Sequence, residues 1–152
     1  MAYAENTSVS VERSRAELER TLTRYGATAF GYMTSPGSAT VVFEANGRRI
    51  RFDLPLPRPD EKRFTHHARG ARTPSAALEA WEQACRQRWR ALNLAVKAKL
   101  EAVDAGISEF EDEFLAFICL PTGQTMADVA RPAIAEAYAS GSMPALTMGG
   151  GR

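Results

Sequence analysis

The sequence predicts an α+β domain made of a helix, a three-stranded antiparallel meander, a long helix packed on the sheet and short C-terminal helices. Two observations support this prediction. Apolar residues recur with helical spacing before residue 26, alternate between residues 27 and 54, and return to helical spacing from residue 78. An Asn-Gly pair at residues 46–47 also separates two alternating runs, which indicates a hairpin because both central residues of its turn need positive φ.

The first helix is expected from Ser10 to Tyr25, followed by Gly26 as the residue that ends it. Three strands are then expected at residues 27–33, 39–45 and 48–54, because these runs are rich in aromatic and β-branched residues. In the third run the apolar side chains alternate with Arg49, Arg51 and Asp53. One face of the sheet is therefore expected to be buried and the other to be wet and partly basic.

A connection rich in proline and basic residues follows, and no regular element is expected in it. The long helix should begin at Pro74, capped by Thr73, and end before Gly106. At 1.5 Å per residue it would be about 45 Å long. Its core-facing stripe is expected to consist of Leu78, Trp81, Cys85, Trp89, Leu92, Val96, Leu100 and Val103, which are spaced close to 3.6 residues apart.

Beyond the long helix, a short aromatic stripe at residues 110–117 predicts a small helix. Thr125, with Asp128 in capping-box position, predicts the start of a last helix that Pro132 should kink or restart and Gly141 should end. The domain organisation expected is a disordered leader at residues 1–9, one domain at residues 10–141 and a flexible tail at residues 142–152.

Charge is unevenly distributed along a chain whose net charge is only +1. Residues 48–99 contain 13 basic and 5 acidic residues, whereas residues 100–152 contain 2 basic and 8 acidic residues. A positive field is thus expected over the middle of the chain. The opposite charges of these two segments also predict a head-to-tail homo-oligomer, which would form a ring or a filament.

Eight basic residues of the middle segment are the candidate phosphate-binding site. Three should lie on the long helix opposite its apolar stripe, three in the preceding connection, and two on the wet face of the third strand. Such a set would neutralise several phosphates and give salt-dependent, sequence-tolerant binding. Phe64, His66 and His67 in the same connection are expected to stack on unpaired bases. The eight residues are Arg49, Arg51, Arg63, Arg69, Arg72, Arg86, Arg90 and Lys97.

No catalytic residue, cofactor or metal site is predicted. The chain has no glycine-rich phosphate loop, nucleophile elbow or Cys-x-x-Cys pair, and its two histidines are adjacent without further ligands at metal spacing. The carboxylates at 109, 112 and 113 fall on one helical face, for which a solvated face, a subunit contact and an autoinhibitory contact all remain open. Neither a membrane span nor a secretory signal is expected, and both cysteines should be reduced.

Several segments resemble a family of small, mostly uncharacterised proteins encoded by tailed bacteriophages and prophages. The segments are "RSRAELERTLTRYGATAF", "IRFDLPLP", "RQRWRALNLAVKAKLEAVDAGISEFEDEFLA" and "AEAYASGSMPAL", and the likeness covers most of residues 13–146. The Trp-Arg-Ala-Leu helix followed by "FEDEFL" is its most distinctive part. The resemblance implies a phage setting in the host cytoplasm and brings no catalytic motif.

The predicted order of elements also has two architectural analogies. Double-stranded-RNA-binding domains share it, but they need a lysine-rich start to the second helix, where this chain has "TPSAALEAWEQ". Phage single-strand annealing proteins are similar in placing a long helix behind an antiparallel sheet, and they form rings. The leading hypothesis is therefore a non-enzymatic phage protein that binds nucleic acid, above all single-stranded DNA in recombination or replication. The alternative is a protein–protein module that binds and inhibits a host or defence protein.

Overall fold

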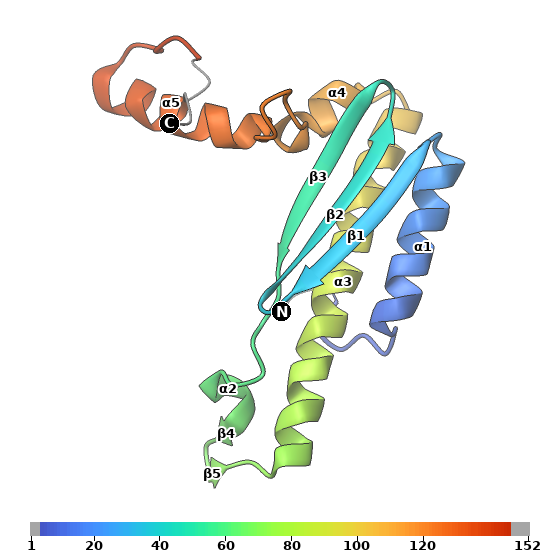
Figure 1. Ribbon diagram of the computed structural model, residues 1–152, viewed down its shortest axis with the longest axis vertical. Coiled ribbons are helices and arrows are strands. Elements are labelled where there is room, and N and C mark those ends of the chain that lie inside the picture. The colour runs from blue at the N-terminus through green and yellow to red at the C-terminus, as the bar shows by residue number, and fades with distance from the viewer. Residues whose placement is uncertain (1–3, 147–152) are drawn as a thin grey trace.

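The computed structural model describes residues 4–146 and confirms the α+β fold class. A helix, a three-stranded meander, a long helix and short C-terminal helices follow one another along the chain (Figure 1). The elements are α1 (Val11–Arg24), β1 (Ala29–Ser35), β2 (Ser38–Ala45), β3 (Arg48–Pro55), α2 (Lys62–Thr65), β4 (His66–His67), β5 (Gly70–Ala71), α3 (Pro74–Asp104), α4 (Phe110–Glu113), η1 (Leu115–Phe117) and α5 (Met126–Ser140).

The three long strands form one antiparallel sheet in the order β1-β2-β3. The hairpin between β2 and β3 turns at Asn46 and Gly47, whose φ angles are 52° and 71°, so the turn prediction is confirmed. Half-buried and buried residues alternate along β2, as expected for a strand with one face on the core. Both α1 and α3 lie behind the same face of the sheet (Figure 1), which leaves the opposite face open.

The core lies between the sheet and the two helices. α1 contributes Leu18 and Leu22, and α3 contributes Trp89, Val96 and Leu100. The sheet contributes an aromatic and aliphatic layer, and Phe114 closes the end of the core beyond α3. The sheet residues of this layer are Ala39, Val41, Phe43, Ala45, Ile50 and Phe52.

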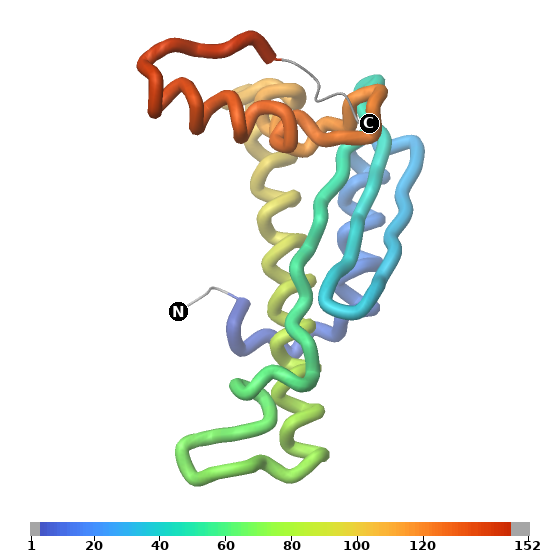
Figure 2. The backbone as a smooth tube through the Cα atoms, turned by 60° about the vertical axis from the view of Figure 1, so that its left-hand side comes forward, coloured from blue at the N-terminus to red at the C-terminus, as the bar shows by residue number. Residues whose placement is uncertain are grey.

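The N-terminal part of α3 extends past the end of the sheet (Figure 2). For this reason the predicted apolar stripe is only partly core: Trp89 is 2% exposed, whereas Leu78 is 50% exposed and Trp81 and Cys85 are half-buried. The prediction that the whole stripe is buried is therefore wrong for its first turns, because no strand covers them. The caps were predicted correctly: the Thr73 side chain accepts a hydrogen bond from Ala76 N at 3.2 Å, with Pro74 in the first turn.

The connection between β3 and α3 is more regular than expected. It contains the short helix α2 and the two-residue hairpin β4-β5, in which His66 pairs with Ala71. Phe64 of α2 is buried, 5% exposed, and α2 contacts α3. An apolar anchor thus holds a segment whose proline and glycine content had predicted an irregular loop.

The C-terminal elements leave the body of the molecule. In both views α5 projects away from the sheet and from α3 (Figures 1 and 2). Thr125 and Asp128 form the predicted capping box, the helix continues through Pro132 as one element, and Gly141 ends it with φ 75°. Of the residues in α5, Ala133 is buried, while Ile134 is 49% and Tyr138 is 90% exposed.

The segments expected to be disordered lie partly outside the described residues. Residues 1–3 and 147–152 are not described. Within the leader, Ala4 is buried, and Gln83 of α3 donates hydrogen bonds to the carbonyls of Glu5 at 3.2 Å and Thr7 at 2.9 Å. This stretch therefore lies against the long helix, and its disorder remains a prediction.

Candidate nucleic-acid interface

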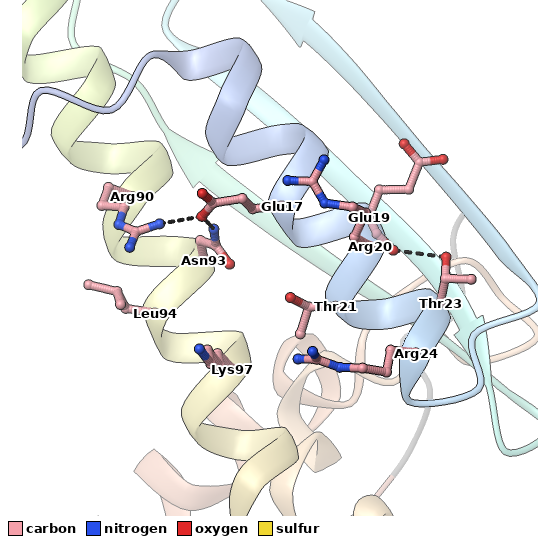
Figure 3. Close-up of a pocket in the computed structure, with 10 residues that line it drawn as sticks. All are labelled: Glu17, Glu19, Arg20, Thr21, Thr23, Arg24, Arg90, Asn93, Leu94 and Lys97. Atoms are coloured by element: carbon pink, nitrogen blue, oxygen red, sulfur yellow. Dashed lines mark hydrogen bonds and ion pairs between the residues drawn. The ribbon is translucent and has the colours of Figure 1, made fainter.

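A groove of about 900 Å³ runs between α1 and α3 on the side of the helices away from the sheet. Figure 3 shows α3 on one side, α1 on the other, and strands behind both. Four cationic side chains line this groove, together with two carboxylates and neutral residues. The cations are Arg20, Arg24, Arg90 and Lys97, and the acids are Glu17 and Glu19.

Glu17 is the centre of the polar contacts in the groove. It accepts a hydrogen bond from Arg90 at 2.5 Å and one from Asn93 Nδ2 at 3.2 Å, and its other oxygen lies 3.5 Å from Arg13. Burial acts to raise the pKa of Glu17, but the hydrogen bond and charge of Arg90, helped by Arg13, outweigh it and hold the pKa below its usual range. Glu17 is therefore ionised at neutral pH and neutralises Arg90.

The other three cations of the groove, Arg20, Arg24 and Lys97, have no carboxylate partner among the described residues. Arg20 and Lys97 make no ion pair within residues 4–146, and the Arg24 guanidinium lies 5.7 Å from the centroid of the Tyr25 ring. Arg20 and Arg24 are four residues apart on α1, so they lie on one face of that helix about one turn apart. The groove therefore presents a cation from α3 opposite two cations from α1 (Figure 3).

The structure does not bring the eight predicted residues together. Arg49 and Arg51 lie on the open face of the sheet, separated from the groove by the sheet and the helices. Arg49 is bound to Glu44 at 2.8 Å. Arg51 donates to the carbonyl of Gly123 at 2.8 Å and lies 3.3 Å from a carboxylate oxygen of Asp53. These two arginines mainly hold the sheet and the turn before α5.

The three arginines of the connection lie at the far end of α3, around α2 and the β4-β5 hairpin. Arg63 is paired with Glu61 at 2.7 Å, and Arg72 donates to the carbonyl of Phe64 at 3.2 Å. Arg69 is exposed, as are the neighbouring histidines. Because Phe64 is buried, the expectation that it stacks on a base is wrong.

The three cations predicted on α3 do lie along one stretch of that helix. Arg86 donates two hydrogen bonds to Gln83 Oε1, at 3.0 and 2.6 Å, and Arg90 is held by Glu17. Both are only partly exposed, so their placement on a solvated face opposite the stripe is wrong: α1 packs beside that face. Lys97 is exposed as expected.

Arg20 and Arg24 of the groove were missed by the sequence reasoning. Their spacing of four residues was visible, but they alternate with glutamates along the chain and were interpreted as a solvated face. In the folded helix Arg20 and Arg24 line the groove, and so do Glu17 and Glu19, whereas Glu12 does not. The only signal in the sequence was the four-residue spacing of the two arginines, which places them on one face of a helix.

The acidic residues at 109–113 are partly paired within the chain. Glu111 lies 3.4 Å from Arg48 of β3, and Glu113 lies 3.7 Å from Lys99 of α3. These pairs favour intramolecular contacts for two of the carboxylates. In the part of the chain that the structure describes, no group of three or more potential ligands is placed to hold a metal ion. No helix there is long and apolar enough to cross a membrane.

Comparison of the chain with protein-family models, with curated proteins and with solved structures found no match.

Proposed function

We propose that this chain is a non-enzymatic, phage-encoded protein that binds single-stranded DNA in the host cytoplasm during recombination or replication. The observation that supports this proposal most is the groove between α1 and α3. It presents Arg20, Arg24 and Lys97 from two helices, and none of these three is neutralised by an ion pair among the described residues.

The dimensions of the groove suit a phosphate backbone. On α3 the groove runs from Arg90 to Lys97, seven residues apart, which is about 10 Å at 1.5 Å per residue. In a duplex each strand has one phosphate for about every 3.4 Å of rise, and the spacing is wider in an extended single strand, so about two or three phosphates fit along this length. Cations in a groove contact phosphates without reading base edges, so the binding is expected to tolerate different sequences.

A charge-reversal experiment tests the proposal. Binding of a labelled single-stranded oligonucleotide would be measured by fluorescence anisotropy over a range of salt concentrations. The double variant Arg20→Glu with Lys97→Glu should weaken binding at least about tenfold and reduce the salt slope by about 0.7 for each lost phosphate contact. The double variant Arg88→Glu with Arg131→Glu is the matched control, because both arginines are exposed outside the groove and the total change of charge is the same.

The choice of Arg20 and Lys97 follows from the structure. Reversal of Arg90 would place a carboxylate beside Glu17 and disturb the contact between the helices, so a loss of binding would not be informative. If the double variant binds as tightly as the control, or if both show no salt dependence, the groove is not a phosphate site.

A second candidate function, a module that binds and inhibits a host or defence protein, is supported by a different observation. The helix α5 projects from the body with Ile134 and Tyr138 exposed. Large exposed apolar side chains on a projecting element are typical of protein contacts. A photo-crosslinker in place of Tyr138, used in infected host cells, should then join the chain to one host protein. Crosslinks to the chain alone, or none, would exclude this candidate.

A further inference from the structure

A second cleft, of about 500 Å³, lies where α3 extends past the end of the sheet. Its walls come from the start of α1, the end of β1, Leu56 directly after β3, and the first half of α3. Both tryptophans of the chain, Trp81 and Trp89, line it, together with Cys85. The cleft exists because the apolar stripe of α3 continues beyond the last residues that the strands cover.

Arg15 occupies an unusual position in this cleft. Its guanidinium carbon lies 4.5 Å from the centroid of the Tyr32 ring and 5.0 Å from that of Trp89, and these rings meet edge to face at 6.3 Å. Arg15 has no carboxylate partner within residues 4–146, and its Nε is buried without a hydrogen-bond acceptor. The planar Arg15 guanidinium therefore lies against two aromatic rings, and its Nε–H donor has no acceptor among the described residues.

We propose that this cleft takes one unpaired nucleobase of the bound strand, which stacks on the Arg15 guanidinium with Trp81 beside it. This inference rests on the proposed function. A pocket for one unpaired base would make the binding selective for single strands over duplexes. Bases stack on aromatic rings and on arginine planes in single-strand recognition. A base within a duplex presents no free face and cannot enter.

The charges around the cleft fit a base better than a phosphate. Glu12 and Glu82 line it alongside Arg15 and Arg86. Carboxylates repel a phosphate but accept hydrogen bonds from the amino groups of cytosine, adenine or guanine. Arg86 of the cleft lies one helical turn before Arg90 of the groove, so a strand that leaves the groove at this end is expected to place its next base at the cleft.

Tryptophan fluorescence tests the inference without any label, because both tryptophans of the chain line the cleft. Three probes would be titrated: a short oligo(dC), the same length of backbone with abasic residues throughout, and a duplex. We expect oligo(dC) to quench the emission and to bind about tenfold more tightly than the abasic strand, since one stacked base accounts for such a factor. The abasic strand and the duplex should bind through the groove with no quenching.

The variant Arg15→Lys keeps the charge but removes the planar group. It should abolish the quenching and reduce oligo(dC) affinity to that of the abasic strand, while abasic-strand affinity stays unchanged. Arg88→Lys is the matched control, because Arg88 is exposed on α3 and lines neither the groove nor the cleft. Binding of oligo(dC) with no quenching, or equal affinity for oligo(dC) and the abasic strand, overturns the base pocket but leaves the groove intact. Absence of binding by all three probes overturns the proposed function itself.

The two cysteines give an independent measurement on the unmodified chain. Burial raises the pKa of the Cys85 thiol, with Glu82 adding to the effect, so it should react slowly with a thiol reagent at neutral pH. Bound oligo(dC) should slow the reaction of Cys85 further, whereas Cys119, which lies beside β3 outside the cleft, should react at an unchanged rate. If bound oligo(dC) slows the reaction of both thiols equally, or slows the reaction of neither, the placement of the base in the cleft is contradicted.

Discussion

Replacement of Trp89 by alanine tests the packing of the long helix on the sheet. Trp89 is 2% exposed and has the largest of the fully buried side chains among the described residues. A tryptophan buries about 200 Å², which at about 25 cal/mol per Å² gives an upper bound near 5 kcal/mol. The expected loss is about 3–5 kcal/mol, the range measured for large aromatic residues whose deletion leaves a cavity. The Tyr32 ring and the Arg15 guanidinium also lose their partner.

Urea unfolding followed by far-UV circular dichroism measures this loss, and Trp81→Ala provides the comparison. Trp81 is half-buried on the part of α3 that the sheet does not cover, and it donates a hydrogen bond to the Pro57 carbonyl at 2.7 Å. Its replacement should cost about 1–2.5 kcal/mol, from partial burial and one hydrogen bond. A loss below about 1 kcal/mol for Trp89→Ala, or a larger loss at Trp81 than at Trp89, would refute the assignment of the core.

Two further predictions concern pH and assembly. The pKa of Glu17 is lowered in the fold, so its contribution to stability is present above the pKa of an unfolded glutamate and is lost as pH falls through the folded pKa. Urea melts of the wild type and Glu17→Gln should therefore differ at neutral pH and converge in acid; a constant difference contradicts the role of the Arg90 pair. Light scattering should show a head-to-tail multimer that loosens when added salt shortens the Debye length below about 10 Å, its value at 0.1 M. A monomer at every salt concentration and at tens of micromolar chain rules out that assembly.

Most of the fold was predictable because its signals are local. The Asn46-Gly47 turn, the Thr73 cap before Pro74 and the Thr125 capping box each depend on residues within four positions of one another. Each places a boundary of an element. The alternation in β3 likewise assigns Ile50 and Phe52 to the buried face without any knowledge of what covers them.

The connection before α3 shows where local signals fail. Its prolines and glycine predicted an irregular segment, but Phe64 packs into the fold and anchors a short helix and a hairpin. Burial of one aromatic side chain is enough to outweigh weak local preferences in so short an element. The same burial removes Phe64 from the residues available to a nucleic acid.

The candidate site was predictable only in part. The sequence indicated that the middle of the chain is basic, and Arg90 and Lys97 do line the groove. It did not indicate that Arg49 and Arg51 lie on the other side of the sheet, bound to acceptors of their own. Closeness along the chain is a poor guide to a charged surface, since successive strand and helix residues point in different directions.

The sequence by itself determined the order of α1, the three-stranded meander, α3 and α5, together with the buried face of the sheet, because turns, caps and periodicity act over a few residues. Only the tertiary structure decided which cations share a surface. The packing of α1 beside α3 brings Arg20 and Arg24 opposite Lys97, and the extension of α3 past the sheet opens the cleft at Arg15. These arrangements depend on contacts between residues more than seventy positions apart, such as Glu17 with Arg90, for which a single sequence contains no local signal.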